Sequence, residues 1–161
     1  MKEFIDKISS YNILNYLFPG IIFVIILNKV SNFNLIQNDI LLGVFFYYFI
    51  GLIISRIGSL FIEPFFRFIK FLKFVDYNNF MKASKLDSKI VLFSEINNMY
   101  RTLSSLFLLI ILVKIYEKYF IEIPFFKEYG NIILTFMILF LFLFSYKKQT
   151  EFITKRVNAN S

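Results

Sequence analysis

The stretch ILLGVFFYYFIGLIISRIGSLFI, residues 40–62, has Arg56 as its only charged residue. A helix needs about 20 mainly apolar residues to cross the roughly 30 Å hydrocarbon layer of a bilayer, and this stretch is long enough. The whole chain has the same character, because 58% of its 161 residues are hydrophobic and 24 are Phe. Soluble domains are about 45–50% apolar. We therefore expect an all-α integral membrane protein.

Further apolar stretches precede and follow this one. The expected spans cover about residues 10–28, 40–60, 100–119 and 129–147 of a single membrane domain, 1–161. A segment at 63–100 connects the second span to the third. The first stretch has no small-residue cleavage pattern after Asn28, so we expect it to stay as a span rather than to be removed as a signal peptide.

Lysine and arginine are concentrated on one side of this topology. The N-terminal end, the segment between the second and third spans, and the C-terminal tail carry Lys2, Lys7, Arg67, Lys70, Lys73, Lys82, Lys85, Lys89, Arg101, Lys147, Lys148, Lys155 and Arg156. Short cytoplasmic loops of membrane proteins have such an excess of positive residues. We therefore expect both termini and residues 63–100 to be cytoplasmic.

Several kinds of chemistry are excluded by composition. The chain contains no Cys and no His, which rules out disulfides, Cys/His zinc sites, a Cys nucleophile and His acid–base catalysis. No span carries a paired acidic motif, and no Gly-rich phosphate loop is present. We expect a protein that is not an enzyme and that needs no cofactor and no metal.

Small residues and a proline interrupt the first two spans. Pro19 has no N–H to donate, and Gly20 follows it, so a kink is expected there, either as a packing feature or as a gating hinge. Gly51, Ser55 and Ser59 recur every four residues in the second span. Such a ridge lets helices approach closely in lipid. We expect it to hold a homo-oligomer together.

Polar residues recur at one depth of the inner leaflet. Arg56 lies roughly 6 Å inside the inner boundary at about 1.5 Å per residue, and Asn15, Ser104 and Ser105 lie at a similar depth. Arg56 either extends its head group to the cytoplasmic interface or meets these groups in a polar layer. That layer, with Ser55, would either join helices or line a vestibule between subunits.

A second charged group lies nearer the outer side. Lys114 and Glu117 are three residues apart and share a helix face. They form either a local ion pair or a charged ring at the outer mouth of an oligomeric pore. The second alternative adds both residues to the candidates for a pore lining.

The segment after the second span is basic. Pro64 suits the first turn of a helix, so we expect the span to end just before it and a new helix to start. In that helix Arg67, Lys70 and Lys73 recur every three residues among Phe, Ile, Leu and Val. This pattern predicts a basic amphipathic helix over 64–75, which binds anionic lipid headgroups or an anionic ligand or partner.

Two aspartates are expected to start the helices that follow. Asp76 and Asp87 are suitable N-caps, because their side chains can accept hydrogen bonds from free N–H groups of a first turn. We expect the helix after Asp87 to continue into the third span.

In size, topology and Phe-, Ile-, Lys- and Asn-rich composition, the chain resembles the small multi-helix membrane effectors of bacterial anti-phage defence systems. The resemblance implies a cytosolic sensor or a nucleotide or oligonucleotide signal as partner, and action by permeabilising the membrane. We therefore expect an oligomeric channel or pore-type effector in the bacterial inner (plasma) membrane, gated by an anionic signal or a cytosolic partner. The alternatives are a non-conducting membrane anchor or adaptor, which recruits a soluble partner through the basic segment, and a holin-like protein.

Overall fold

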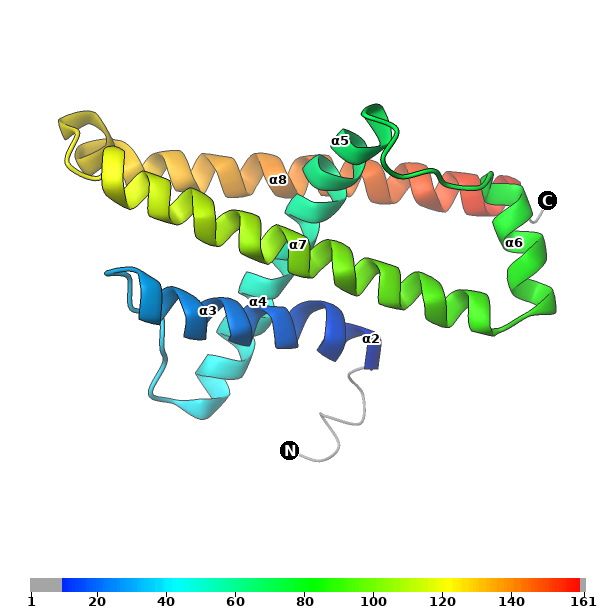
Figure 1. Ribbon diagram of the computed structural model, residues 1–161, viewed down its shortest axis with the longest axis horizontal. Helices are drawn as coiled ribbons and strands as arrows, with labels where there is room; N and C mark the ends of the chain where they lie inside the picture. The colour runs from blue at the N-terminus through cyan, green and yellow to red at the C-terminus, as the bar shows by residue number, and fades with distance from the viewer. Residues whose placement is uncertain (1–9, 160–161) are drawn as a thin grey trace.

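The computed structural model describes residues 10–159, and every regular element in that range is helical (Figure 1). In chain order these are α2 (Ser10–Asn12), η1 (Ile13–Leu17), α3 (Phe18–Val30), α4 (Ile40–Ile57), η2 (Gly58–Ile62), α5 (Glu63–Phe68), α6 (Tyr77–Leu86), α7 (Lys89–Tyr119) and α8 (Pro124–Asn158), where η marks a π-helical turn. In this part of the chain, four helical stretches are long and apolar enough to cross a membrane: Ile13–Val30, Ile40–Phe68, Lys89–Tyr119 and Pro124–Asn158. The prediction of an all-α protein with four such segments is confirmed.

The helices are arranged around α4. In Figure 1, α3, α7 and α8 extend along the long axis of the molecule, and α4 with η2 and α5 crosses them at a steep inclination. Helix α4 contacts α3, α7 and α8. The α3–α4 connection and the α7–α8 turn lie at one end of the molecule, while α6 and the C-terminal part of α8 lie at the other. Lys2 and Lys7, which contributed to the expected orientation, lie outside the described residues.

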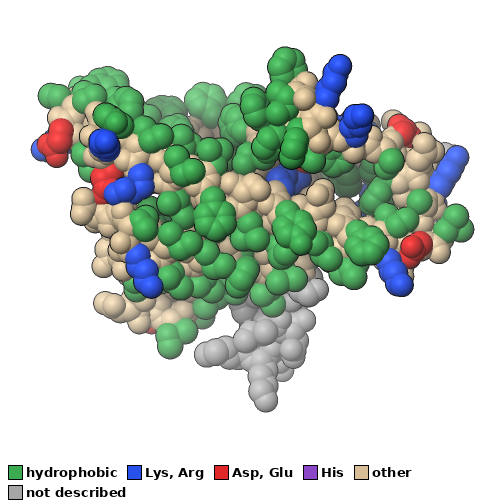
Figure 2. Space-filling model, viewed as in Figure 1, with side chains coloured by type: hydrophobic (Ala, Val, Ile, Leu, Met, Phe, Trp, Pro, Cys, Tyr) green, Lys and Arg blue, Asp and Glu red, His purple; other side chains and the backbone are tan. Residues whose placement is uncertain are grey.

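The core lies where α3, α4 and α7 meet. It consists of Phe23, Val24, Leu27, Ile54, Leu106 and Ile110. Val24, Ile54 and Leu106 are at most 1% exposed. Helix α8 is attached more loosely, since its buried residues within the described range are Leu141 and Ser145. The face in Figure 2 is mostly apolar, with charged side chains gathered toward its two ends, which is the distribution that a lipid environment favours.

Glycine allows the first two long helices to touch through their backbones. A Cβ atom on Gly20 would overlap the Tyr47 carbonyl of α4, and one on Gly51 would overlap the Tyr16 carbonyl of η1. Close approach of this kind is how helices associate in lipid, where apolar burial provides no drive between helices. A π turn, η1, also ends at Leu17, just before Pro19 and Gly20, and the kink expected there stays a prediction.

Pro19 and Pro64 each follow a π turn. The N–H of Phe18 bonds the carbonyl of Ile13, and the N–H of Glu63 bonds the carbonyl of Gly58, five residues back in each case. A proline ring normally clashes with the carbonyl four residues earlier in a helix. The wider turn lets the helix continue through Pro64. The expectation that a new helix starts at Pro64 is wrong, because one continuous helix runs through this proline to Phe68.

The predicted basic amphipathic helix over 64–75 is also wrong beyond its first turn. Helix α5 ends at Phe68, and Lys70 has a φ of 60°, in the left-handed region. The N–H groups of residues 71 and 72, which follow Lys70, both donate to the carbonyl of Phe66. Residues 71–76 are not helical. A left-handed residue of this type is a common way to end a helix. The three basic residues therefore do not share a helix face.

Both aspartates that were expected to cap helices accept a hydrogen bond from a backbone N–H at the start of a helix. The Asp76 side chain accepts a hydrogen bond from the N–H of Asn78 at 2.9 Å and starts α6. The Asp87 side chain accepts one from the N–H of Lys89 at 2.9 Å, at the beginning of α7. The single helix α7 then runs from the connecting segment into the third span, as predicted.

Replacing Gly51 with Ala should loosen the crossing of η1 and α4. The added methyl group has to push away the Tyr16 backbone, and overpacking of this kind costs about 1–3 kcal/mol. Thermal or denaturant unfolding of the detergent-solubilised protein measures the loss.

Gly43→Ala is the matched control for this prediction. Gly43 is also buried in α4, but a Cβ atom there meets nothing closer than 3.4 Å, on the Tyr47 ring. The gain in helix propensity is the same for both variants. Equal stabilities of the two variants would contradict the close crossing.

Candidate functional site

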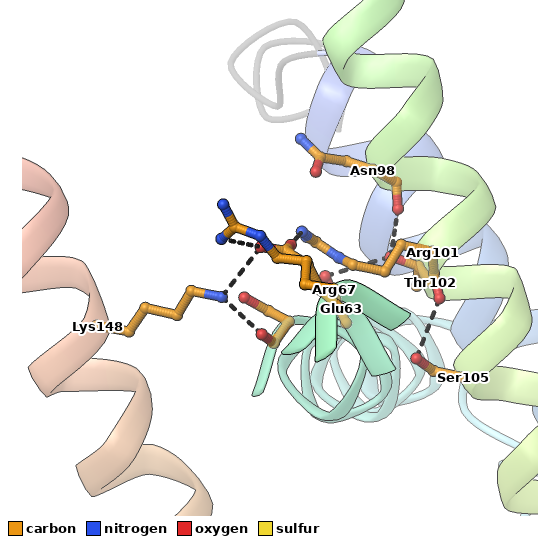
Figure 3. Close-up of polar contacts among 9 residues, drawn as sticks. Glu63, Arg67, Asn98, Arg101, Thr102, Ser105 and Lys148 are labelled. Atoms are coloured by element: carbon orange, nitrogen blue, oxygen red, sulfur yellow. Dashed lines mark hydrogen bonds and ion pairs between the residues drawn. The ribbon is translucent and has the colours of Figure 1, made fainter. Parts of the chain in front are cut away.

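A charged cluster centred on Glu63 lies where α5 passes between α7 and α8 (Figure 3). Nη1 of Arg101, on α7, lies 2.6 Å from Oε2 of the carboxylate. Nζ of Lys148, on α8, lies 3.6 Å from Oε1, and Nη1 of Arg67, one turn along α5, lies 4.0 Å from the same oxygen. Arg101 and Lys148 reach the carboxylate from opposite sides. We call these four residues the Glu63 cluster.

The side chains of the Glu63 cluster differ in their exposure to solvent. The side chains of Glu63 and Arg101 are 15% and 20% exposed, whereas those of Lys148 and Arg67 are 40% and 56% exposed. The Arg101 Nε is buried without a hydrogen-bond partner among the described residues. An ion pair with little solvent around it is screened less than one at the surface, so this contact fixes α5 against α7.

The π turn η2 creates a second contact for Lys148. In a π turn the Ser59 carbonyl would accept from the residue five positions later, but that residue is Pro64, which has no N–H. The Lys148 Nζ donates to this carbonyl at 2.6 Å. A buried backbone carbonyl without a partner is costly in lipid. Lys148 therefore satisfies a backbone group of η2 as well as the carboxylate of Glu63.

A second polar layer joins η1, α4 and α7. Nη2 of Arg56 donates to the hydroxyl of Tyr16 at 3.2 Å. The hydroxyl of Thr102, which is fully buried, donates to the Asn98 carbonyl at 2.9 Å and lies 3.3 Å from the hydroxyl of Ser55. These contacts lie in the region where the sequence placed the polar layer around Arg56.

The side chains of the other residues expected in that layer donate hydrogen bonds to backbone carbonyls of their own helices. Asn15, Ser104 and Ser105 each donate to the carbonyl four residues earlier, at 3.2, 2.9 and 3.1 Å. Asn15 is 1% exposed, and its Oδ1 has no partner among the described residues. Ser104 is exposed, whereas Ser105 is buried against Gly58. The structure therefore does not bring these three side chains to Arg56; the partner of Arg56 is Tyr16.

The small-residue ridge of α4 and η2 is used within the chain. Gly51 lies against the Tyr16 backbone, Ser55 bonds Thr102, and Ser59 is 7% exposed. Because η1, α7 and α8 cover these positions, the ridge is not free for a second copy. In the structure the ridge packs within one copy of the chain, and the expected homo-oligomer stays a prediction.

The charged pair formed by Lys114 and Glu117 ties a loop to α7. Nζ of Lys114 lies 2.7 Å from Oε2 of Glu117, and the other carboxylate oxygen accepts a hydrogen bond from the Asn32 N–H at 2.6 Å. Glu117 thus connects the end of α7 to the segment between α3 and α4. A carboxylate with two such donors has a local structural role.

Sequence reasoning missed the centre of the site, although one signal pointed to it. Glu63 is the only acidic residue between Asp39 and Asp76, and an acidic residue isolated beside an apolar span needs a partner. Arg101 and Lys148 were counted as orientation signals. Thr102 was not singled out.

Comparison with protein-family models, curated proteins and solved structures finds no match to this chain.

Tyr16→Phe should destabilise the protein by about 1–3 kcal/mol, because it removes the acceptor of the half-buried Arg56 guanidinium. Tyr48→Phe is the matched control: the Tyr48 ring packs edge-on against Tyr16, with centroids 5.5 Å apart, and its loss of a hydroxyl leaves the Arg56 contact intact. Unfolding in detergent compares the two variants. A larger effect for Tyr48→Phe would show that Arg56 does not depend on the Tyr16 hydroxyl.

Proposed function

We propose that the protein is an oligomeric channel or pore-type effector of the bacterial inner membrane. The observation that carries the proposal is the retention of charge inside apolar helices. Arg56 lies within the long apolar stretch of α4, held by Tyr16, and the Glu63 cluster follows about two turns later. Ionisable groups in membrane segments are expensive and typically mark ion pathways or their control elements.

An assembly of several copies is part of the proposal. A few helices rarely enclose a pathway alone, but a symmetric ring of subunits can. The ridge of α4 is covered within the chain, so the contact surface between copies is assigned to the apolar faces of α7 and α8. Exposed aromatic and aliphatic side chains support this assignment, among them Phe107, Ile111, Phe136, Phe140 and Phe144.

The proposal places both termini and the segment between α4 and α7 in the cytoplasm. The distribution of Lys and Arg supports this orientation. A role in anti-phage defence, with a cytosolic sensor or a nucleotide-type signal upstream, follows the resemblance in size and composition. Phage challenge of cells that carry the gene, with growth and membrane potential followed after infection, tests that role.

A non-conducting anchor is the second candidate, and α6 is the observation that favours it. Half of the residues of this helix are exposed, among them Lys82 and Lys85. It lies at one end of the molecule beside the ends of α7 and α8, and Tyr77 packs against Phe152 of α8 with centroids 5.7 Å apart. A firmly placed polar helix at the membrane boundary would suit recruitment of a soluble partner.

Ion flux distinguishes the two candidates. Protein reconstituted in liposomes should conduct, with a preference for anions, because Arg56 presents positive charge near the pathway. Arg56→Gln should lower that preference without abolishing assembly, and Lys147→Gln, on the exposed face of α8, should leave it unchanged. Reversal potentials under a salt gradient measure the effect. Electrically silent liposomes would favour the anchor.

The absence of Cys allows a direct test of orientation. Single cysteines at Asn38, in the α3–α4 connection, and at Asn79, on α6, are both at exposed positions. A membrane-impermeant maleimide added to intact spheroplasts should label the first and not the second, while both react after lysis. Labelling of both in intact spheroplasts would contradict the proposed topology.

A further inference from the structure

The Glu63 cluster carries more positive charge than its carboxylate can neutralise. Arg67, Arg101 and Lys148 all lie within 4.0 Å of Glu63. One negative charge among three positive ones leaves a surplus of two, concentrated around a single carboxylate. Like charges this close to one another repel, and the low polarity of a membrane boundary strengthens that repulsion. A bound anion would relieve it.

We propose that Arg67, Arg101 and Lys148 bind the phosphate of an anionic phospholipid headgroup. Basic pockets between membrane helices bind such headgroups, and guanidinium groups match phosphate geometry through paired N–H donors. This inference does not depend on whether the protein conducts ions. It also moves the anion site away from Lys70 and Lys73, which lie beyond the end of α5.

The cluster has unused donors on its accessible side. Arg67 and Lys148 flank the same carboxylate oxygen and are the two most exposed members. A guanidinium has five N–H donors and an ammonium has three, so the contacts to Glu63 and Ser59 leave several available. The Arg67 guanidinium also lies 4.7 Å above the ring of Phe74, which restricts its orientation. The buried Nε of Arg101 has no partner among the described residues.

The surroundings favour a lipid over a soluble phosphate. On α5, Phe65 is 56% exposed and Phe68 is 85% exposed, and Phe71 beyond the helix is 72% exposed. Large aromatic side chains this exposed, next to a cationic cluster, provide an apolar surface for acyl chains while the phosphate meets the charges. A free phosphate ion would use the charges and leave this surface uncovered.

Two variants with opposite expected effects test the site. In Arg67→Gln/Lys148→Gln two phosphate ligands are removed, so the affinity for phosphatidylglycerol should fall about 10-fold or more. Glu63→Gln removes the competing carboxylate and keeps the cations, so the affinity should rise. If the cluster were only a structural ion pair, Glu63→Gln would not raise it.

The measurement is lipid retention by the purified full-length protein. Native mass spectrometry counts phosphatidylglycerol and phosphatidylcholine bound after titration in detergent, and Lys73→Gln/Lys147→Gln provides a control with the same change in net charge. The control should bind phosphatidylglycerol within about 2-fold of the unaltered protein. Circular dichroism and gel filtration establish whether each variant is folded. If the double variant is not folded, Arg67→Lys is measured in its place and should retain part of the affinity for phosphatidylglycerol.

A competition arm identifies the source of the phosphate. Millimolar pyrophosphate should fail to displace phosphatidylglycerol, because it lacks acyl chains. Displacement by pyrophosphate, with direct binding of pyrophosphate in phosphatidylcholine nanodiscs, would overturn the headgroup assignment. Equal retention of the two lipids, or equal loss in the double variant and its control, would overturn the site itself.

Discussion

The backbone contact between η1–α3 and α4 is the constraint on which the other contacts depend. Because Gly20 and Gly51 lack side chains, each helix brings a carbonyl against the other's backbone. This crossing places the Tyr16 hydroxyl beside Arg56 and turns Ser55 toward α7. Attraction between membrane helices comes from such close packing and from polar contacts rather than from apolar burial. A larger residue at either glycine would separate the helices and leave the polar layer without its partners.

A local backbone irregularity explains where the charges gather. The π turn η2 and Pro64 leave the Ser59 carbonyl without a partner in its own helix, and Lys148 supplies one from α8. The same turn lets the helix continue far enough to carry Glu63 between α7 and α8. Pro64 therefore acts through its missing N–H, which leaves the Ser59 carbonyl able to accept a hydrogen bond from Lys148 of α8. π turns occur at functional sites more often than elsewhere, and here one underlies the whole Glu63 cluster.

The sequence predicted features that depend on local pattern and missed those that depend on how helices meet. Long apolar runs identified the four candidate spans, and Asp76 correctly marked the start of α6. The helix over 64–75 failed in its second half, because α5 ends at Phe68 and Lys70 adopts a left-handed conformation. The continuation through Pro64 was missed because it depends on a π turn that packs against α7. The partners of Glu63 could not be predicted from the sequence, because Arg101 is 38 residues further along the chain on α7 and Lys148 lies on α8. The placement of Gly51 within the chain, rather than between copies, likewise depends on tertiary structure.

The position of α5 between α7 and α8 has a consequence for synthesis in the cell. Near their connecting turn the last two helices pack together through Tyr116 and Phe126, while α5 lies between them further along. Helix α8 is the last of the described helices to leave the ribosome, and its Lys148 completes the contacts of the Ser59 carbonyl and the Glu63 carboxylate. Until then, the Ser59 carbonyl lacks its hydrogen-bond donor from α8, while Glu63 is already paired with Arg101. A chain interrupted before α8 would therefore leave a backbone carbonyl without a donor, and the addition of α8 satisfies it.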